Sequence, residues 1–215
     1  INEMITHRYR FINYNGLRKS HLRDLTQNGN INPFDNKVII IDEAHNFVSR
    51  IVNKMRDAES LSVQLYEYLL AAENCRIVFL SGTPIINYPN ELGILFNILR
   101  GYIKTWNIPL NIRTSRKINK DEMITIFKDL QVLDYLDYKP ASKMLTITKN
   151  PFGFINVNKD GIYKGVSNFK VAKRGEVSDA DFIKLVTSIL NKNEIDVIAS
   201  SIRVENFKAL PDTLD

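Results

Sequence analysis

Short apolar runs alternate with helical stretches over the first hundred residues. Residues 9–14 (YRFINY), 38–41 (VIII) and 77–80 (IVFL) predict strands, and we expect residues 38–41 to be buried on both faces of a sheet. Residues 17–25 predict a helix, and Leu61, Leu65, Tyr68 and Leu69 recur at helical spacing within residues 60–73. A further amphipathic helix is marked by Leu92, Leu95, Phe96 and Leu99. Such long crossovers between strands are typical of a parallel sheet flanked by helices.

The pattern changes near residue 105. Residues 123–136 (MITIFKDLQVLDYL) predict helix, and three strand-like runs follow at residues 144–148, 153–157 and 162–166, the last two joined by a hairpin turn at residues 158–161. Ser178 is expected to cap a further helix, with acids in its first turn and Phe182, Leu185, Val186 and Ile189 on its apolar face. We therefore predict an α/β protein. Residues 1–104 form a partial parallel sheet flanked by helices, and residues 105–215 form a smaller α+β module.

Composition narrows the protein class. With 215 residues, 44% of them hydrophobic, the chain can bury a substantial core. A single cysteine excludes an intrachain disulfide framework, and no apolar stretch approaches the ~20 residues that span a bilayer. We expect an intracellular protein without membrane association. Because the chain begins at Ile1 rather than Met, we also expect it to be a piece of a longer protein.

The positive charge is concentrated in the middle of the chain. Residues 100–174 contain 15 Lys and Arg against 6 Asp and Glu, whereas the rest of the chain is net acidic. This asymmetry is compatible with phosphate contacts to nucleic acid, to which Lys170, Lys173 and Arg174 could contribute, and equally with a soluble module that docks a protein. A second basic cluster at Arg8, Arg10, Arg18, Lys19 and Arg23 leaves the same two interpretations open.

Polar clusters follow two of the predicted strands. The first is Asp42, Glu43 and His45; the second is Ser81, Gly82 and Thr83. A strand that leaves a core needs one polar residue, but two adjacent acids at that point cost stability unless they are hydrated, paired or metal-bound. Ligands of parallel sheets lie beyond the carboxyl ends of the strands, so both clusters are expected at one edge. One carboxylate there can hold a phosphate-bridging Mg²⁺, and its neighbour can orient an attacking water.

These segments resemble a known group of motor proteins. IIIDEAHN (residues 39–46) followed by FLSGTPIINYPNELGILFNIL (residues 79–99) resembles motifs II and III of superfamily 2 DEAH-type helicases and translocases, in a form close to the Swi/Snf-type ATPases. FINYNGL, LTITKNPFGFINV and YKGV more narrowly resemble helicase-like transcription ATPases of large nucleocytoplasmic DNA viruses, which are relatives of poxvirus early-transcription-factor and nucleoside-triphosphate phosphohydrolase subunits.

The resemblance implies a role for each matching residue. Asp42 would coordinate Mg²⁺ and bind ATP together with Ser81, Gly82 and Thr83. Glu43 would activate the hydrolytic water, and His45 would link to the Ser81–Thr83 segment and act with Glu43 in catalysis. Tyr14, Asn15 and Gly16 would lie near the nucleic-acid path.

The same resemblance implies an architecture and partners. Residues 1–104 would be the C-terminal half of the first RecA-like lobe, and residues 105–215 an inserted module. The partners would be DNA or RNA and viral RNA polymerase or transcription-factor subunits, in the virion or the host cytoplasm.

One departure from the family pattern limits what this chain does alone. No G-x-x-x-x-G-K-[ST] phosphate loop occurs in the sequence, so the chain by itself is expected not to hydrolyse ATP, whereas the full-length protein would be a nucleic-acid-dependent ATP hydrolase. The alternative is a non-enzymatic module that binds nucleic acid or a polymerase and retains a degenerate ATPase lobe.

Overall fold

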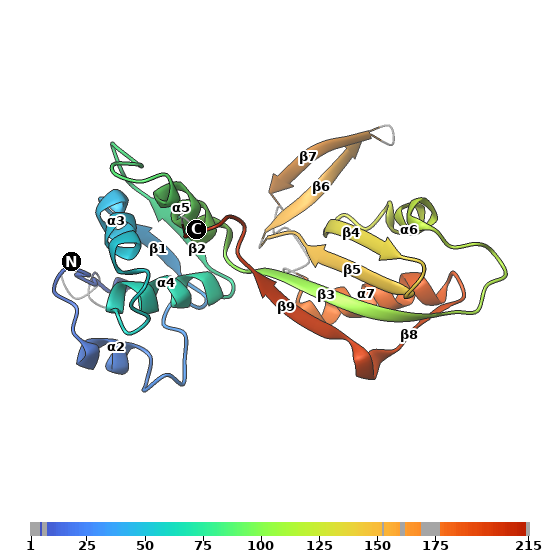
Figure 1. Cartoon of the computed structure of the whole chain (residues 1–215), viewed down its shortest axis with the longest axis horizontal. Coiled ribbons are helices and arrows are strands. Elements are labelled where there is room, and N and C mark those ends of the chain that lie inside the picture. Colours follow the sequence, from blue (N-terminus) through green and yellow to red (C-terminus); the bar gives the residue numbers. More distant parts are fainter. Residues whose placement is uncertain (1–4, 6–7, 152, 160–161, 169–176, 214–215) are drawn as a thin grey trace. The chain divides into compact units, whose positions relative to one another are not determined.

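The chain folds into two compact units. The computed structural model describes residues 5, 8–151, 153–159, 162–168 and 177–213. Unit 1 comprises Ile1–Tyr102 together with Lys208–Asp215, and unit 2 comprises Ile103–Phe207 (Figure 1). Unit 2 is thus inserted into unit 1, and the last residues of the chain return to the first unit. The predicted α/β class is confirmed, since the chain combines helices with a parallel sheet and antiparallel sheets.

Unit 1 is built on a parallel strand pair. β1 (Val38–Ile41) pairs with β2 (Arg76–Phe79) over the full length of both strands. The helices among the described residues of this unit include α2 (Lys19–Leu25), α3 (Ala44–Lys54), α4 (Leu61–Ala71) and α5 (Asn90–Arg100). Their apolar residues form one core with the inward side chains of the strands, and Tyr66, Val48 and Ile51 are fully buried in it.

The described residues cover only one face of this strand pair. Ile39, Ile41, Ile77 and Phe79 pack on the core. The alternate residues are open to solvent: Val38 is 67% exposed, Ile40 61%, Val78 42% and Leu80 48%. The prediction that residues 38–41 are buried on both faces is therefore wrong for this chain. The four side chains form a contiguous apolar surface, which we call the bare face.

The apolar stripe predicted for residues 92–99 also differs from the one that is buried. Ile94, Asn97 and Ile98 of α5 are inaccessible to solvent, whereas Leu92, Phe96 and Leu99 lie on the exposed side. The segment NELGILFNILR is apolar almost all round, so spacing alone could not select its inner face.

The strand predicted at residues 9–14 does not form. Tyr9 and Phe11 are exposed, and only Ile12 and Tyr14 pack against the unit 1 core. Extended residues become a strand only by pairing, and none of the described strands pairs with this segment. A turn closes it, in which the Gly16 amide donates to the Asn13 carbonyl oxygen at 3.2 Å.

Unit 2 is organised around one long strand. β3 (Ile103–Ile112) pairs on one edge with β5 (Met144–Lys149), which in turn pairs with β4 (Leu133–Lys139). Its other edge pairs with β9 (Arg203–Phe207) and β8 (Ile195–Val197), and every pairing is antiparallel. A separate hairpin consists of β6 (Phe154–Lys159) and β7 (Ile162–Asn168), and the unit also contains α6 (Lys120–Phe127), α7 (Asp179–Asn191) and the short 3-10 helix η1 (Ala199–Ser201).

Alternation along β3 builds the core of unit 2. Trp106, Ile108 and Leu110 point inward and meet Phe182 and Val186 of α7. The Trp106 and Phe182 rings lie 5.2 Å apart between centroids in a tilted arrangement, so Trp106 is a packing residue of this core.

Two predictions for unit 2 need comment. The helix predicted over residues 123–136 ends at Phe127, and residues 133–136 belong to β4 because they pair with β5. The Ser178 cap is confirmed, since its hydroxyl accepts the Asp181 amide at 3.1 Å, although Leu185 of the predicted apolar face is 42% exposed. The hairpin is confirmed by the pairing of Lys159 with Ile162, while residues 160–161 of its turn lie outside the described residues.

Among the described residues, every helix is too short or too polar to cross a lipid bilayer.

Candidate functional site

The two predicted clusters lie side by side at the carboxyl ends of β1 and β2. In the parallel register Ile41 is opposite Phe79, so Asp42 and Leu80 leave the sheet together. The Leu80 amide donates to the Ile41 carbonyl oxygen at 3.0 Å, and the Ala44 amide donates to the Leu80 carbonyl oxygen at the same distance. These bonds extend the strand pairing by one residue and bring the start of α3 against the Ser81–Thr83 segment.

His45 connects the two clusters directly. Its Nδ1 lies 2.8 Å from the Ser81 hydroxyl oxygen and 3.4 Å from Oε2 of Glu43. Ser81 in turn accepts the Thr83 amide at 3.2 Å, which fixes the turn that contains Gly82. The imidazole is largely buried, with 14% of its side chain exposed, whereas 61% of the Glu43 side chain is exposed. A single side chain of α3 therefore touches both an exposed carboxylate and the end of the neighbouring strand.

Glu43 adopts a backbone conformation that is unusual for a residue with a side chain. Its φ is 48° and its ψ is 47°, in the left-handed region, immediately before α3 begins. This conformation costs roughly 1–2 kcal/mol for a residue other than glycine. Such strain is concentrated at functional sites, where the surrounding structure holds it in place. Here it turns the chain within one residue from β1 into α3, so that both acids face solvent at the strand end.

Asp42 is suited to a hydrated cation. Its Oδ1 accepts the Glu43 amide at 3.0 Å, and the residue is exposed. Mg²⁺ keeps several waters and is commonly held by one or two carboxylates together with substrate phosphates. In the described part of the chain no group of three or more His, Cys, Asp or Glu side chains could hold a metal without such help. An exposed carboxylate such as that of Asp42 can contribute one ligand to a hydrated cation.

Tyr14 brings a third segment to the same edge. Its hydroxyl lies 3.5 Å from the Glu43 carbonyl oxygen, and its ring packs on Phe47 of α3 at 5.3 Å between centroids. Arg50 donates to the Tyr14 carbonyl oxygen at 3.3 Å. Burial raises the pKa of the Tyr14 phenol, so it stays neutral at physiological pH. The exposed residues Asn15 and Gly16 follow in the turn beside the strand ends.

Sequence reasoning missed a buried carboxylate behind the Ser81–Thr83 turn. Glu91, in the first turn of α5, is only 1% exposed. Its Oε2 accepts the Ile86 amide at 2.7 Å and the Asn87 amide at 3.1 Å. The Asn87 side chain donates to Oε1 of Glu91 at 3.3 Å and to the Ser49 hydroxyl of α3 at 2.9 Å. The carboxylate therefore ties the chain that follows the turn to both α5 and α3.

Opposing effects set the protonation of Glu91. Burial alone would raise the pKa of its carboxyl, but the hydrogen bonds from the Ile86 and Asn87 amides and from the Asn87 side chain outweigh it, and the pKa is lowered. The group is therefore charged at neutral pH. The sequence signal that could have found it is an acid in the first turn of a largely apolar helix.

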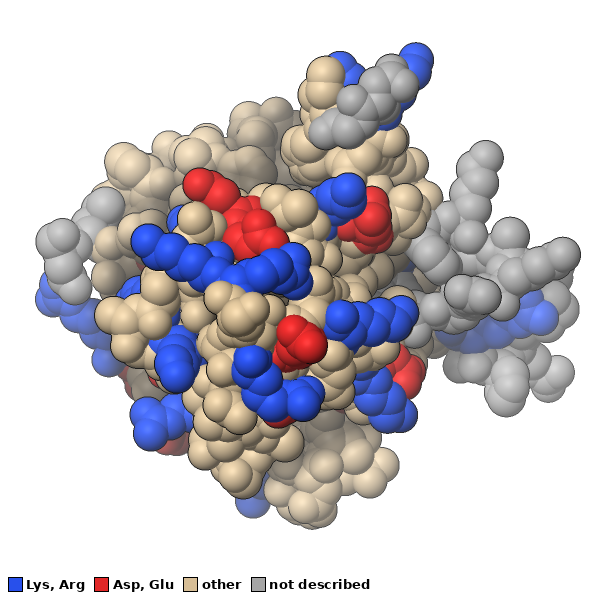
Figure 2. All heavy atoms as spheres, turned by 90° about the vertical axis from the view of Figure 1, so that its right-hand side faces the viewer, with Lys and Arg blue, Asp and Glu red and all other residues tan. Residues whose placement is uncertain are grey.

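On the face drawn in Figure 2, Lys and Arg side chains of the described residues are interleaved with Asp and Glu. Many cations of unit 2 are occupied: the ion pairs are Arg113–Asp196, Arg116–Glu122, Lys120–Asp137, Lys149–Asp179 and Lys104–Asp179. Lys149 is largely buried and also donates to the Val177 carbonyl oxygen. Lys170, Lys173 and Arg174 lie outside the described residues.

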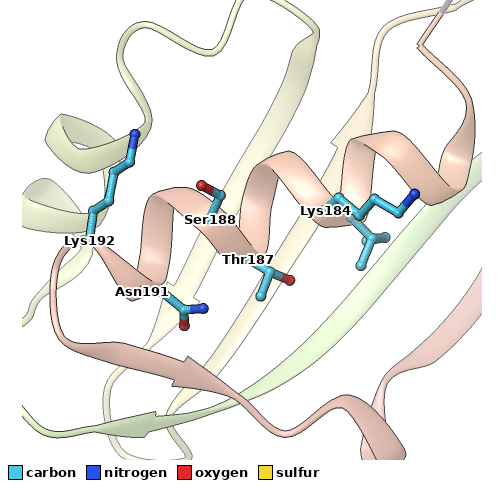
Figure 3. A pocket seen from close by; sticks show the side chains of 6 residues that line it. Lys184, Thr187, Ser188, Asn191 and Lys192 are labelled. Atoms are coloured by element: carbon cyan, nitrogen blue, oxygen red, sulfur yellow. The ribbon is translucent and has the colours of Figure 1, made fainter.

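A shallow hollow runs along α7, far in sequence from the strand-end clusters. It is lined by Ile183, Lys184, Thr187, Ser188, Asn191 and Lys192. Figure 3 shows the five labelled polar side chains along the outer side of the helix. Because they recur at intervals of three and four residues opposite Phe182, Val186 and Leu190 of the core, we interpret them as the solvated face of an amphipathic helix.

Comparisons with known proteins found similarities to viral proteins named as helicases and as a termination factor homolog. The chain is 30% identical over 129 residues to a protein of African swine fever virus named "Termination factor NPH-I homolog", a match that covers 57% of this chain and 18% of that protein. These similarities extend to mimivirus. Over 66 residues the chain is 41% identical to a candidate ATP-dependent RNA helicase of Acanthamoeba polyphaga mimivirus, R350, covering 28% of this chain and 8% of the relative.

A second mimivirus protein, the candidate ATP-dependent RNA helicase R563, is 26% identical over 155 residues, covering 66% of this chain and 25% of the relative. The chain resembles helicase-like viral proteins. It spans a quarter or less of the length of each of these curated relatives. No family model matches the chain, and no solved structure matches it significantly.

Proposed function

We propose that this chain is part of a nucleic-acid-dependent ATPase, a helicase or translocase of superfamily 2 that works in viral transcription. The observation that carries the proposal is the contact between His45 and Ser81, which joins the acidic end of β1 to the end of β2. Relatives named as helicases and as a termination factor support it.

The two acids take different roles in this proposal. Asp42, whose exposed carboxylate follows the strand directly, would hold Mg²⁺ with the phosphates of ATP. Bound Mg²⁺ would neutralise charge on the phosphates during transfer. Glu43 points from the same strand end and would accept a proton from the attacking water, the role of a general base. His45, in contact with Glu43 and Ser81, would carry the state of that carboxylate to the Ser81–Thr83 turn.

The rest of the nucleotide site would come from the longer protein. The chain contains no phosphate-loop motif, and the phosphates need the backbone amides and lysine of such a loop. The bare face of β1 and β2 supports the existence of further structure, because monomeric proteins rarely leave so apolar a sheet surface in water. We propose that the preceding part of a RecA-like lobe covers this face, and that unit 2, Ile103–Phe207, is a module inserted in that lobe.

For unit 2 a protein partner is the second candidate role. Ion pairing of its described cations leaves fewer charges for phosphates than the sequence suggests. A polymerase or transcription-factor subunit would fit a module of this kind. A salt titration decides: phosphate contacts would make log K fall by roughly 0.7–0.9 per contact with log salt concentration. Changing Lys170, Lys173 and Arg174 together to Ala would reduce that slope if they bind nucleic acid, and would leave it unchanged if they do not.

The main test uses the full-length protein and a matched pair of histidine variants. His45→Ala should retain Mg-ATP binding but lose most of the stimulation of phosphate release by nucleic acid. His21→Ala, which changes an exposed histidine on α2 of the same unit, should behave as wild type. Stimulation that survives in His45→Ala would refute the proposed coupling.

A further inference from the structure

The insertion of unit 2 leaves and re-enters unit 1 at one place. Tyr102 is the last residue of unit 1 before the insertion, and Lys208 is the first one after it. The residues next to them, Ile103 and Phe207, are opposite partners in the antiparallel pairing of β3 with β9. The two connecting chains therefore run side by side where they meet unit 1.

One carboxylate of α4 binds both connecting chains. The Tyr102 hydroxyl donates to Oε2 of Glu67, and the Lys208 ammonium group lies 3.1 Å from Oε1 of the same side chain. Lys208 also bonds to Oδ2 of Asp212 at 2.7 Å and lies 4.9 Å above the centre of the Tyr66 ring. Burial raises the pKa of the Tyr102 phenol, and the hydrogen bond that the phenol donates to Glu67 raises it further, so the phenol remains a donor.

The segment that returns to unit 1, residues 208–213, is held on α5 by hydrogen bonds. Asn97, which is fully buried, accepts the Leu210 amide at 2.8 Å and donates to the Leu210 carbonyl oxygen at 2.9 Å. The next residue approaches Gly93 so closely that a Cβ there would lie 2.2 Å from the Pro211 carbonyl oxygen. Both features show that this segment packs as part of unit 1.

The two ends of α5 contact different parts of the protein: the segment behind the Ser81–Thr83 turn at its start, and the connection to unit 2 at its end. At its start, Glu91 holds the Ile86 and Asn87 amides behind the Ser81–Thr83 turn. At its end, Gly101 and Tyr102 lead directly into the insertion, and the Tyr102 amide donates to the Leu70 carbonyl oxygen of α4 at 2.9 Å. Glu91 and Asn97 are six residues apart, about 9 Å along a helix, which is short enough for the helix to move as a rigid rod.

We propose that Glu67 couples the inserted unit to the strand-end site. Its contacts with Tyr102 and Lys208, which we call the clasp, fix both connecting chains on α4. Any displacement of these chains is then carried by α5 to the segment behind Ser81–Thr83. Glu67 is a positioning residue in this scheme and touches no substrate. The scheme rests on the proposed function only for the meaning of the strand-end site. The mechanical coupling is a property of the 215-residue chain and can be measured without nucleotide.

Amide hydrogen exchange on the 215-residue chain provides the test, because four hydrogen-bonded amides report on the two ends of α5. Tyr102 and Leu210 report on the clasp, and Ile86 and Asn87 on the strand-end side. Glu67→Ala should accelerate exchange at the first pair about tenfold or more and at the second pair severalfold. Buried helical amides at Val48 and Ile51 of α3 should change little, which separates coupling from general destabilisation.

Matched variants sharpen the test. Glu59→Ala removes an exposed carboxylate that pairs with Lys19, and it should leave all four amides at wild-type rates. Tyr102→Phe and Lys208→Met each remove one arm of the clasp and should give smaller accelerations at both pairs; they decide the question if Glu67→Ala does not fold. Acceleration confined to Tyr102 and Leu210, or equal acceleration of all amides including those of α3, would overturn the coupling. If the coupling is found but the wild-type full-length protein shows no ATPase activity, only the proposed function is refuted.

Discussion

Nδ1 of His45 lies 2.8 Å from the Ser81 hydroxyl oxygen, although 36 residues separate the two in sequence. The contact exists because the parallel register of β1 and β2 ends both strands at the same level. It makes the position of α3 depend on the turn after β2. A change in charge or coordination at Asp42 and Glu43 therefore has a short structural route to that turn.

Ser81→Ala tests this route at its second member. The substitution removes the partner of His45 and the acceptor of the Thr83 amide, so exchange at the Thr83 amide should accelerate severalfold. Both bonds are solvent-accessible, so overall stability should fall by less than about 1 kcal/mol. Ser142→Ala, which changes an exposed serine of unit 2, should leave the Thr83 amide unaffected. An unchanged Thr83 amide in Ser81→Ala would show that the turn is held by other contacts.

Glu91→Gln tests the buried carboxylate behind the turn. The glutamine side chain keeps the shape of Glu91 but loses the negative charge that accepts the Ile86 and Asn87 backbone amides. Its NH₂ group would also face the Asn87 side-chain amide, which is itself a donor. Unit 1 should lose about 1–3 kcal/mol of unfolding free energy in urea. Glu59→Gln, at an exposed carboxylate, should stay within about 0.5 kcal/mol of wild type. An unchanged unfolding free energy in Glu91→Gln would mean that the charge does not stabilise this site.

Gly93→Ala tests the fit of the returning segment. The added methyl group would collide with the Pro211 carbonyl oxygen, and overpacking of this kind costs roughly 1–3 kcal/mol. Helix propensity works in the opposite direction by up to about 1 kcal/mol, so a net loss is expected in urea unfolding of unit 1. Gly82→Ala is the control, because a Cβ there meets nothing within 4 Å. A stabilised Gly93→Ala protein would place residues 208–213 elsewhere.

Asp179 should make unit 2 sensitive to acid. Burial would raise the pKa of its carboxyl, but hydrogen bonds and charges from Lys104 and Lys149 outweigh burial and lower it. A carboxyl with a lowered folded-state pKa contributes stability above its unfolded pKa, and this contribution is lost as pH falls through the folded value. The stability difference between wild type and Asp179→Asn should therefore be largest near neutral pH and vanish at acidic pH. Fluorescence of Trp106, the single tryptophan, reports unit 2 unfolding, and a pH-independent difference would contradict the assignment.

The sequence predicted the strand-end arrangement better than the packing around it. Two aliphatic runs that end in polar clusters are a local signal, and both strands and their parallel pairing were predictable from it. The inner face of α5 was not, because Leu92 and Phe96 are as apolar as Ile94 and Ile98, and only the surrounding helices select between them. Residues 133–136 were predicted as helix because their apolar spacing also fits a helix, and pairing with β5 decided for a strand.

Long-range polar contacts account for the rest. Glu67, Tyr102 and Lys208 carry no motif, and they meet only because unit 2 begins and ends at the same place. The return of residues 208–213 to unit 1 likewise depends on contacts more than a hundred residues apart, such as those of Asn97 with Leu210. Local periodicity contains no information about such pairs.

The central claim, that Glu43 positions the hydrolytic water while Asp42 holds the metal, is tested most directly by turnover of the full-length protein. Single-turnover hydrolysis and equilibrium binding of Mg-ATP should be measured for wild type, Glu43→Gln and Asp42→Ala. Glu43→Gln should bind Mg-ATP as wild type does and hydrolyse it about 10²–10⁴-fold more slowly, and Asp42→Ala should also weaken binding. Wild-type hydrolysis by Glu43→Gln, or equal losses of binding and turnover in both variants, would contradict the account.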